Sequence, residues 1–80
     1  MEKDKLKQEV HEARGVIVLV QEDRFRMETK DGLSLLLILG NGSRSSIEDL
    51  EKWASSSRRV HVRYRGVPEA GAVALEVRPE

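Results

Sequence analysis

The order of apolar and alternating runs along this chain constrains its fold more than any single residue does. Between residues 13 and 79 the sequence has three runs typical of β-strands, one short helical pattern and two further strand-like runs. Five strands in an open sheet would leave exposed edges, which a closed arrangement removes. At 80 residues the chain can build a single compact core. The sequence therefore predicts one small, mainly β domain.

The first two runs differ in which faces they would bury. Residues 16–20 follow Gly15 and are apolar on both faces, so this strand needs cover on both sides or must curve from one sheet into another. Residues 21–23 are polar and predict a turn. Residues 24–30 alternate and predict a half-buried strand. Its expected inward side chains are Phe25, Met27 and Thr29, and its outward ones are Arg24, Arg26, Glu28 and Lys30.

The pair Asp31-Gly32 predicts a two-residue hairpin turn, because both central positions of such a turn need a positive φ. The second and third strands should then be antiparallel neighbours. The third run, residues 33–39, ends at the loop formed by residues 40–42. That loop lacks the Lys-Ser/Thr pair of a phosphate-binding loop, so we interpret it as a plain connection.

A short helix should follow, because two pairs fit the capping spacing in which a hydroxyl accepts from an amide of the first turn. These pairs are Ser45 with Glu48 and Ser46 with Asp49. Three serines, residues 55–57, should end the helix without a glycine cap. The side chains expected on its buried face are Ile47, Leu50, Trp53 and Ala54.

Two more strands complete the pattern. Residues 58–65 alternate, and Pro68 places residues 66–71 in a loop because proline cannot donate to a central ladder. Residues 72–77 alternate again, with Val73, Leu75 and Val77 on one face. In the fourth strand the expected inward side chains are Val60, Val62 and Tyr64, and the outward ones are Arg59, His61, Arg63 and Arg65.

Residues 1–14 are nearly all polar and form a segment separate from the domain expected at residues 15–80. Leu6, Val10 and Ala13 make a weak helical stripe, so the segment is either a frayed helix or a tail.

Composition restricts the function more by exclusion than by suggestion. Lys plus Arg and Asp plus Glu both total 14, so no overall field favours nucleic acid or an anionic membrane. The absence of cysteine removes disulfides, thiolate catalysis and cysteine-based zinc sites. No apolar run approaches the roughly 20 residues of a membrane span, and no secretory signal is evident. We expect a cytoplasmic protein.

The order of elements over residues 13–78 resembles the OB-fold, a five-stranded Greek-key barrel with a helix between strands three and four. The resemblance rests on the glycine-led first strand, the hairpin at Asp31-Gly32, and the helix carried by Ile47, Leu50 and Trp53. It also extends to small bacterial proteins of this shape without an assigned activity. The structural alternative is an open α+β sheet with the helix on one face.

Oligonucleotide-binding OB domains use the outer face of strands two and three, which here carries arginines that could contact phosphates. The side chains that this alternative would use are Arg24, Arg26 and Lys30 on strand two and Arg59, Arg63 and Arg65 on strand four. Single-strand binders also need exposed aromatic rings for base stacking. Phe25, Trp53 and Tyr64 are the only aromatic residues apart from the histidines, and all fall in phase with the core. A solvated charged surface is the favoured interpretation.

The third run is apolar on both faces, so whichever set lies inside, the other needs cover. Either the stripe at Leu6, Val10 and Ala13 folds across it or another chain does. An exposed apolar patch commonly marks a partner surface. We therefore predict a homodimer or hetero-partner contact through the outside of this strand, at Leu36 and Ile38.

No constellation of catalytic or metal-ligating residues stands out. His11 and His61 are not placed together or beside a carboxylate at ligand spacing, and the serines have no histidine base set against them. The sequence therefore predicts no metal, no cofactor and no enzymatic activity. An interaction module is the first hypothesis, and a single-stranded nucleic-acid binder is the second.

Overall fold

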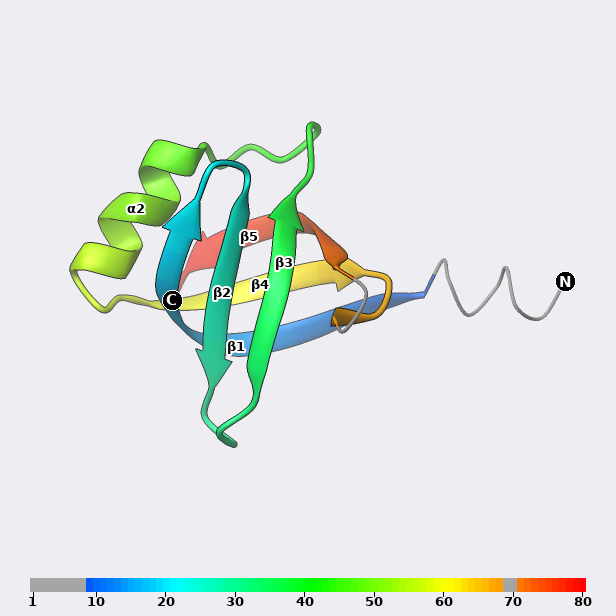
Figure 1. The fold of residues 1–80 in the computed structure, drawn as a ribbon, viewed down its shortest axis with the longest axis horizontal. Helices are drawn as coiled ribbons and strands as arrows, with labels where there is room; N and C mark the ends of the chain where they lie inside the picture. The colour runs from blue at the N-terminus through cyan, green and yellow to red at the C-terminus, as the bar shows by residue number, and fades with distance from the viewer. Residues whose placement is uncertain (1–8, 69–70) are drawn as a thin grey trace, which may run out of the picture.

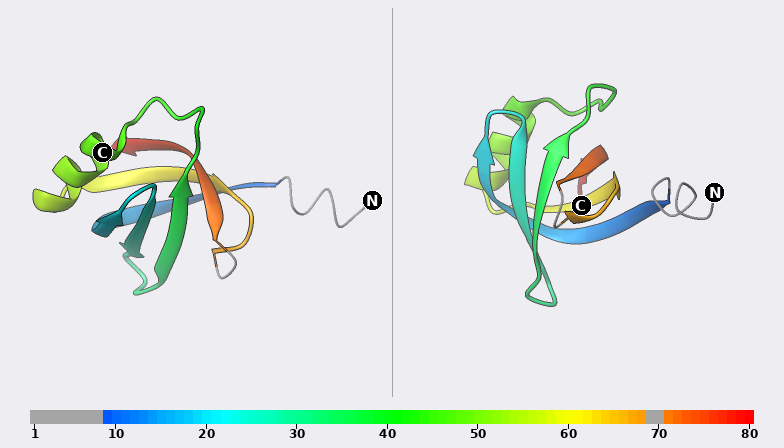
Figure 2. Two further views of the ribbon diagram at one scale, coloured as in Figure 1. Left: turned by 45° about the horizontal axis from the view of Figure 1, so that its top comes forward. Right: turned by 45° about the vertical axis from the view of Figure 1, so that its right-hand side comes forward.

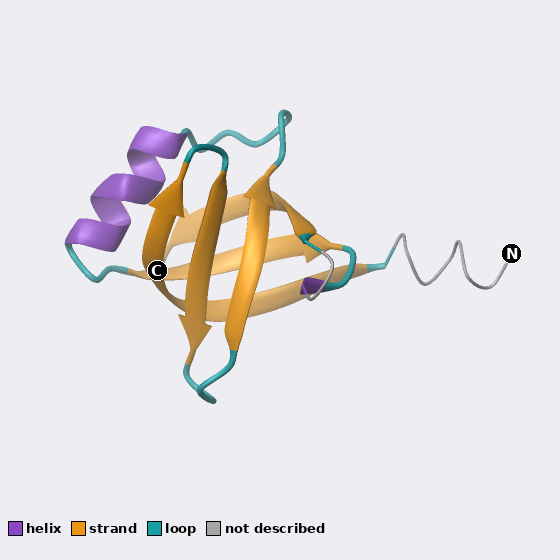
Figure 3. Ribbon diagram, in the orientation of Figure 1, coloured by secondary structure: helices purple, strands orange, loops and turns teal. Residues whose placement is uncertain are grey.

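The computed structural model describes residues 9–68 and 71–80, which form five β-strands and one α-helix (Figures 1 and 3). The order of elements is the one that the sequence predicts. The elements are β1 (Val10–Gln21), β2 (Arg24–Thr29), β3 (Ser34–Leu39), α2 (Ile47–Ser55), β4 (Arg59–Arg65) and β5 (Ala72–Pro79).

The strands close into a ring in the order β1-β2-β3-β5-β4, with β4 returning to β1. Every pair is antiparallel except β3 and β5, which run parallel where residues 37–39 meet residues 72–74. The alternative of an open sheet is therefore wrong. Closure gives one interior that all five strands share.

β1 is the strand that joins the two sides of the ring. It pairs with β4 over residues 10–16 and with β2 over residues 15–21, so only Gly15 and Val16 have partners on both edges. A side chain at Gly15 would collide with the carbonyl oxygen of Glu28 on β2. The strand curves from one partner to the other at the one residue type that permits this approach.

The expected start of the first strand at Gly15 is wrong, because β1 begins at Val10. Residues 10–14 pair with β4 and are neither a helix nor a tail. The spacing of Val10 and Ala13, which suggested a helical stripe, is equally compatible with a strand. Leu6 and the rest of residues 1–8 lie outside the described residues.

The hairpin between β2 and β3 differs from the expected two-residue turn. Gly32 has a positive φ of 87°, but Asp31 does not. The amide of Thr29 donates to the carbonyl of Leu33 at 2.9 Å, and the amide of Gly32 donates to the carbonyl of Thr29 at 3.0 Å. The loop therefore has three residues, in which a glycine with left-handed backbone follows the turn. The antiparallel pairing of β2 and β3 is confirmed.

Of the two predicted caps, the helix uses Ser46. The Ser46 hydroxyl accepts from the Asp49 amide at 3.2 Å, and the Asp49 carboxylate accepts from the Ser46 amide at 3.0 Å. Ser45 has a different role, because its hydroxyl donates to the carbonyl of Val77 at 2.6 Å and ties the start of the helix to β5.

The helix ends in a Schellman motif. The amide of Arg58 donates to the carbonyl of Trp53, and the amide of Ser57 donates to the carbonyl of Ala54. Ser57 has a φ of 53°, so a serine occupies the left-handed position that glycine usually fills.

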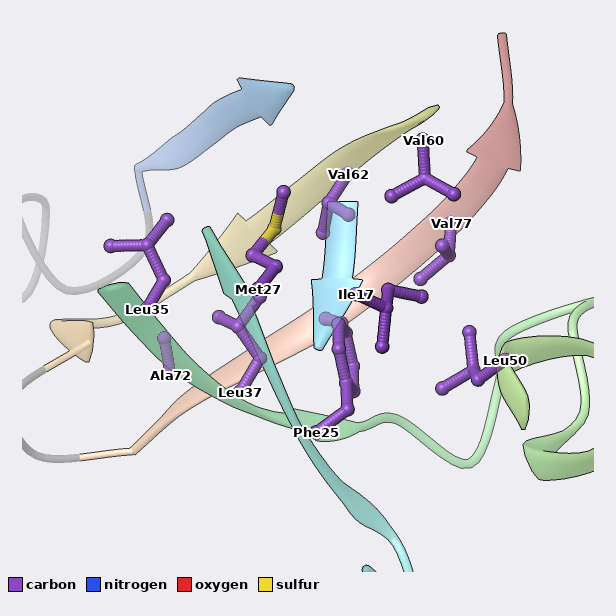
Figure 4. Close-up of a cluster of buried hydrophobic side chains, with 11 residues drawn as sticks. Ile17, Phe25, Met27, Leu35, Leu37, Leu50, Val60, Val62, Ala72 and Val77 are labelled. Carbon is purple, nitrogen blue, oxygen red and sulfur yellow. The ribbon is translucent and has the colours of Figure 1, made fainter. Parts of the chain in front are cut away.

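The core is built from inward-facing side chains of all five strands and the helix (Figure 4). Leu50 of α2 lies at one end of the cluster, and Leu35 and Ala72 lie at the other. The buried residues are Ile17, Phe25, Met27, Leu35, Leu37, Leu50, Val60, Val62, Ala72, Ala74 and Val77.

The face assignment expected for the last strand is wrong over half its length. Ala72 and Ala74 are buried, whereas Val73 is exposed. The β4–β5 register shifts between Arg63 and Tyr64, so the inward phase changes along β5 and Val77 is buried as expected. In the described part of the chain, no helix has the length and apolar character needed to cross a membrane.

Candidate partner-binding site

The structure decides which side of β3 faces the core. Leu35 and Leu37 point inward, and Leu37 is fully buried. Leu36 is 41% exposed on the outer side, where Ile38 is half-buried. Both predicted partner-binding residues therefore lie on the outer surface of the ring, as the sequence interpretation requires.

A neighbour from β5 extends this apolar surface. Val73 is the direct register partner of Ile38 and is 38% exposed. The Cδ1 atom of Ile38 lies over Gly71, 3.6 Å from the position that a Cβ atom there would take. We call Leu36, Ile38 and Val73 the β3 outer face. In the described residues, neither Val10 nor Ala13 crosses it, because both belong to β1 and pair with β4.

A shallow hollow adjoins the β3 outer face. It has a volume of about 270 Å³ and is lined by Arg26, Ser34, Leu36 and Pro68. Pro68 comes from the loop between β4 and β5, so this loop and the β2–β3 hairpin contribute to the same surface.

Two arginines of β2 stand beside this face. Arg24 is the register partner of Ile38, and Arg26 is the register partner of Leu36. Both are exposed, and neither makes an ion pair with any residue of the described ranges. Two residues apart on one strand, they are separated by about 7 Å along it.

The basic residues of β4 are in a different situation. Arg59 pairs with Glu80 at 3.9 Å, and Arg63 pairs with Glu76 at 3.7 Å. Arg65 lies beside Val73 at the end of the strand. Part of the positive charge on this strand is therefore matched by acids of the same chain.

The six basic residues predicted for nucleic acid come from two strands that are not neighbours in the ring. β1 lies between β2 and β4 in the ring, and β3 and β5 separate them on the other side. Lys30 of the hairpin and Arg59 line a common cleft, away from Arg24 and Arg26. The strand order therefore divides these residues between β2 with its hairpin and β4, and Lys30 and Arg59 meet at the cleft between them.

The aromatic rings follow the prediction more closely. Phe25 is 1% exposed and points into the core. Trp53 and Tyr64 are partly buried and pack against the core cluster. In the described part of the chain, the outer surface of β2 and β3 therefore carries no aromatic ring on which bases could stack.

One polar contact was invisible in the sequence. The Nε2 atom of His61 lies 2.6 Å from the Glu12 carboxylate, and Arg78 donates to its Nδ1 atom at 3.4 Å. In this arrangement Nε2 carries the proton and donates to Glu12. Glu12 and His61 are far apart in sequence and meet only because β1 pairs with β4. A contact between two residues this far apart in the chain leaves no local pattern in the sequence from which it could be predicted.

No group of three or more histidine, aspartate or glutamate residues in the described ranges is placed to hold a metal ion. His11 packs against Tyr64 with ring centroids 5.4 Å apart, and not against a carboxylate. The site that the geometry defines is an apolar surface with two neighbouring guanidinium groups.

Comparison with known proteins adds no relative. No family model, no curated protein and no solved structure matches the chain. Functional inference therefore rests on the geometry described above.

Proposed function

We propose that this chain is a small Greek-key barrel of the OB type that acts as a non-enzymatic, cytoplasmic protein-interaction module. The strand order β1-β2-β3-β5-β4, the parallel contact of β3 with β5 and the helix between β3 and β4 support the assignment to this type. The absence of cysteine suits the reducing conditions of the cytoplasm.

One observation carries the functional proposal: the β3 outer face is apolar and lies on the surface. Small domains have little material to spare, yet Leu36, Ile38 and Val73 are placed together outside the core. Clustered exposed apolar side chains are typical of surfaces that bind another protein. The β3 outer face is therefore the docking surface.

The neighbouring arginines define the chemistry of the partner. Guanidinium groups bind carboxylates in well-fixed pairs, and Arg24 and Arg26 have none of their own in the described residues. Their separation of about 7 Å equals that of alternate side chains in an extended chain. The partner is a protein segment that places an aliphatic side chain against Leu36 and acidic side chains against the two arginines.

Site-specific photo-crosslinking tests the docking surface. A benzoylphenylalanine residue at Leu36 should give one discrete adduct in cells that produce the protein, and the adduct should map to an acidic segment of a single partner. Val18 is the matched control, because it is 46% exposed but lies on β1. Adducts of equal yield at Leu36 and Val18, or none at Leu36, would contradict the proposal.

Single-stranded nucleic acid remains the second candidate because Arg24 and Arg26 have no acidic partner in the described ranges. Two phosphate contacts on a single strand would give a slope of about −1.4 in a plot of log affinity against log salt. Fluorescence anisotropy with a 15-residue oligo(dT) measures this slope. We expect no saturable binding. Binding with that slope, lost in Arg24→Ala, would favour the nucleic-acid alternative over the protein partner.

A further inference from the structure

A second surface lies where the ladder between β1 and β2 stops. The last pair of that ladder is Gly15 with Thr29, and beyond it β1 continues along β4 alone. Residues 10–14 of β1 therefore have a strand on one edge only, within the described chain. In an antiparallel ladder, alternate amide and carbonyl groups point to each edge, so this edge presents unpaired main-chain groups.

A cleft of about 670 Å³ opens along this edge. The β2–β3 hairpin extends beyond the ring, away from α2 (Figure 2). Its residues Thr29, Lys30, Asp31 and Leu33 line the cleft together with residues 12–14 of β1. The hairpin does not use the free edge of β1, because its end is bonded internally by Thr29 and Leu33. The lining residues are Glu12, Ala13, Arg14, Thr29, Lys30, Asp31, Leu33, Leu35, Arg59, His61 and Tyr64.

The cleft has an apolar part, which consists of Ala13, Leu35 and Tyr64 and which we call its floor. Ala13 and Tyr64 pack against the core, and Leu35 belongs to it. Leu33 stands at the rim and is 59% exposed, the highest value among the exposed large hydrophobic residues of the described chain. Such a floor suits side chains that alternate along an extended strand and point inward at every second residue.

The charges at the rim are mixed, so they do not single out a polyanion as the occupant. Arg14, Lys30 and Arg59 are positive, but Glu12 and Asp31 line the same cleft. Two of the edge protections found in proteins are missing, because residues 10–14 contain no proline and the β-bulge of β1 lies further on, between Ile17 and Leu19. The charged residues of this edge are Glu12 and Arg14.

We propose that this cleft binds an extended segment of a partner protein by β-strand addition to residues 10–14. The added strand takes the place that β2 would occupy if its ladder continued past Gly15, over a length of about 17 Å. Main-chain hydrogen bonds to β1 supply the affinity, and the floor at Ala13, Leu35 and Tyr64 selects apolar side chains at alternate positions. This surface is separate from the β3 outer face, so either can fail without the other.

An NMR titration tests the proposal. The probe is a synthetic hexapeptide of alternating threonine and valine, and its control is the same peptide with every backbone amide N-methylated. The side chains of the two peptides are identical, but only the first can extend the ladder. We expect amide shifts confined to residues 10–14 and 30–35, and at least tenfold slower exchange for alternate amides of residues 10–14. The methylated peptide should cause neither effect.

A pair of variants sharpens the result. Leu33→Ser should weaken binding of the hexapeptide by about fivefold, whereas Val67→Ser, at a residue 56% exposed in another loop, should leave it unchanged. Equal shifts with both peptides would overturn strand addition, as would shifts centred on Leu36. No shift up to 1 mM peptide would also overturn it. Protection of residues 10–14 that rises with protein concentration alone would replace the partner with a second copy of the chain.

Discussion

At the end of the ring that α2 covers, Leu50 is buried with Ile17, Phe25 and Val77 (Figure 4). At the opposite end, by contrast, Leu33 is exposed beside an open cleft. The same chain thus covers its core with a helix at one end and has an open cleft beside it at the other. The closed end has a capped helix and a hydrogen bond from Ser45 to β5. In this very small molecule, the residues that close the core therefore lie apart from the surfaces that we propose bind a partner.

The outer surfaces of β2 and β4 show a related contrast in their ion pairs. Arg63 of β4 forms an ion pair with Glu76, whereas Arg24 and Arg26 of β2 form none within the described residues. Charges without internal partners lie beside the β3 outer face, where a partner's charges can match them. The following predictions test this division, in order of decreasing effect.

Gly15→Ala should have the largest effect on stability, because Gly15 lies where β1 passes from pairing with β4 to pairing with β2. Its Cβ atom would collide with the carbonyl of Glu28, between two strands that cannot both move away. We expect a loss of at least about 3 kcal/mol in unfolding free energy, measured by urea denaturation. Gly42→Ala is the control, because nothing lies within 4 Å of its added Cβ. Equal unfolding free energies for the two variants would contradict the close approach of β1 to β2 at Gly15.

Truncating a leucine at each end compares the ends directly. Leu50→Ala removes a fully buried side chain and should cost about 3 kcal/mol. Leu33→Ala removes an exposed one and should change stability by less than about 0.5 kcal/mol. Denaturation followed by circular dichroism measures both. A costly Leu33→Ala variant would show that the open end also carries the core.

The end of the helix can be improved without touching either binding surface. Ser57 has a left-handed backbone, which a residue with a Cβ adopts at a cost that glycine avoids. We expect Ser57→Gly to raise the unfolding free energy by about 1 kcal/mol in thermal or urea melts. The neighbouring Ser56→Gly should not, since Ser56 has a φ of −92° and its hydroxyl bonds to the Lys52 carbonyl. A gain for both or for neither would refute the Schellman assignment.

Removing the exposed ion pair between Arg63 and Glu76 should have the smallest effect on stability. Arg63→Ala breaks a contact of 3.7 Å between side chains that are 49% and 34% exposed. We expect a change below about 0.5 kcal/mol that fades further in 0.5 M salt. Arg24→Ala should be equally neutral for folding but should weaken partner binding. A large loss of stability in Arg63→Ala would mean that the ion pair between Arg63 and Glu76 contributes substantially to folding.

Much of the fold could be predicted because local signals agree with the tertiary structure. The clean alternation of β2 places Phe25 and Met27 inside, and the spacing of Ser46 and Asp49 gives the helix start. Leu36 and Ile38 could be named as surface residues because a strand that is apolar on both faces must leave one face outside. These inferences need only periodicity and capping rules.

The remainder depended on contacts between distant residues. The start of β1 at Val10 is set by pairing with β4, for which a mixed polar sequence gives no local sign. The shifted register between β4 and β5 reverses the expected face of Val73. The free edge of residues 10–14 and the contact of Glu12 with His61 exist only once the ring closes. The division between β2 and β4 likewise follows from strand order, which composition does not encode.

Residue-resolved hydrogen exchange on the free protein tests the division between the two ends most directly. The amides of Leu50, Val60 and Val62 should exchange only through global unfolding, because they lie in the closed part of the core. Alternate amides of residues 10–14 should exchange orders of magnitude faster while the rest of β1 stays protected. Uniform protection along β1, or rapid exchange throughout α2, would contradict the account.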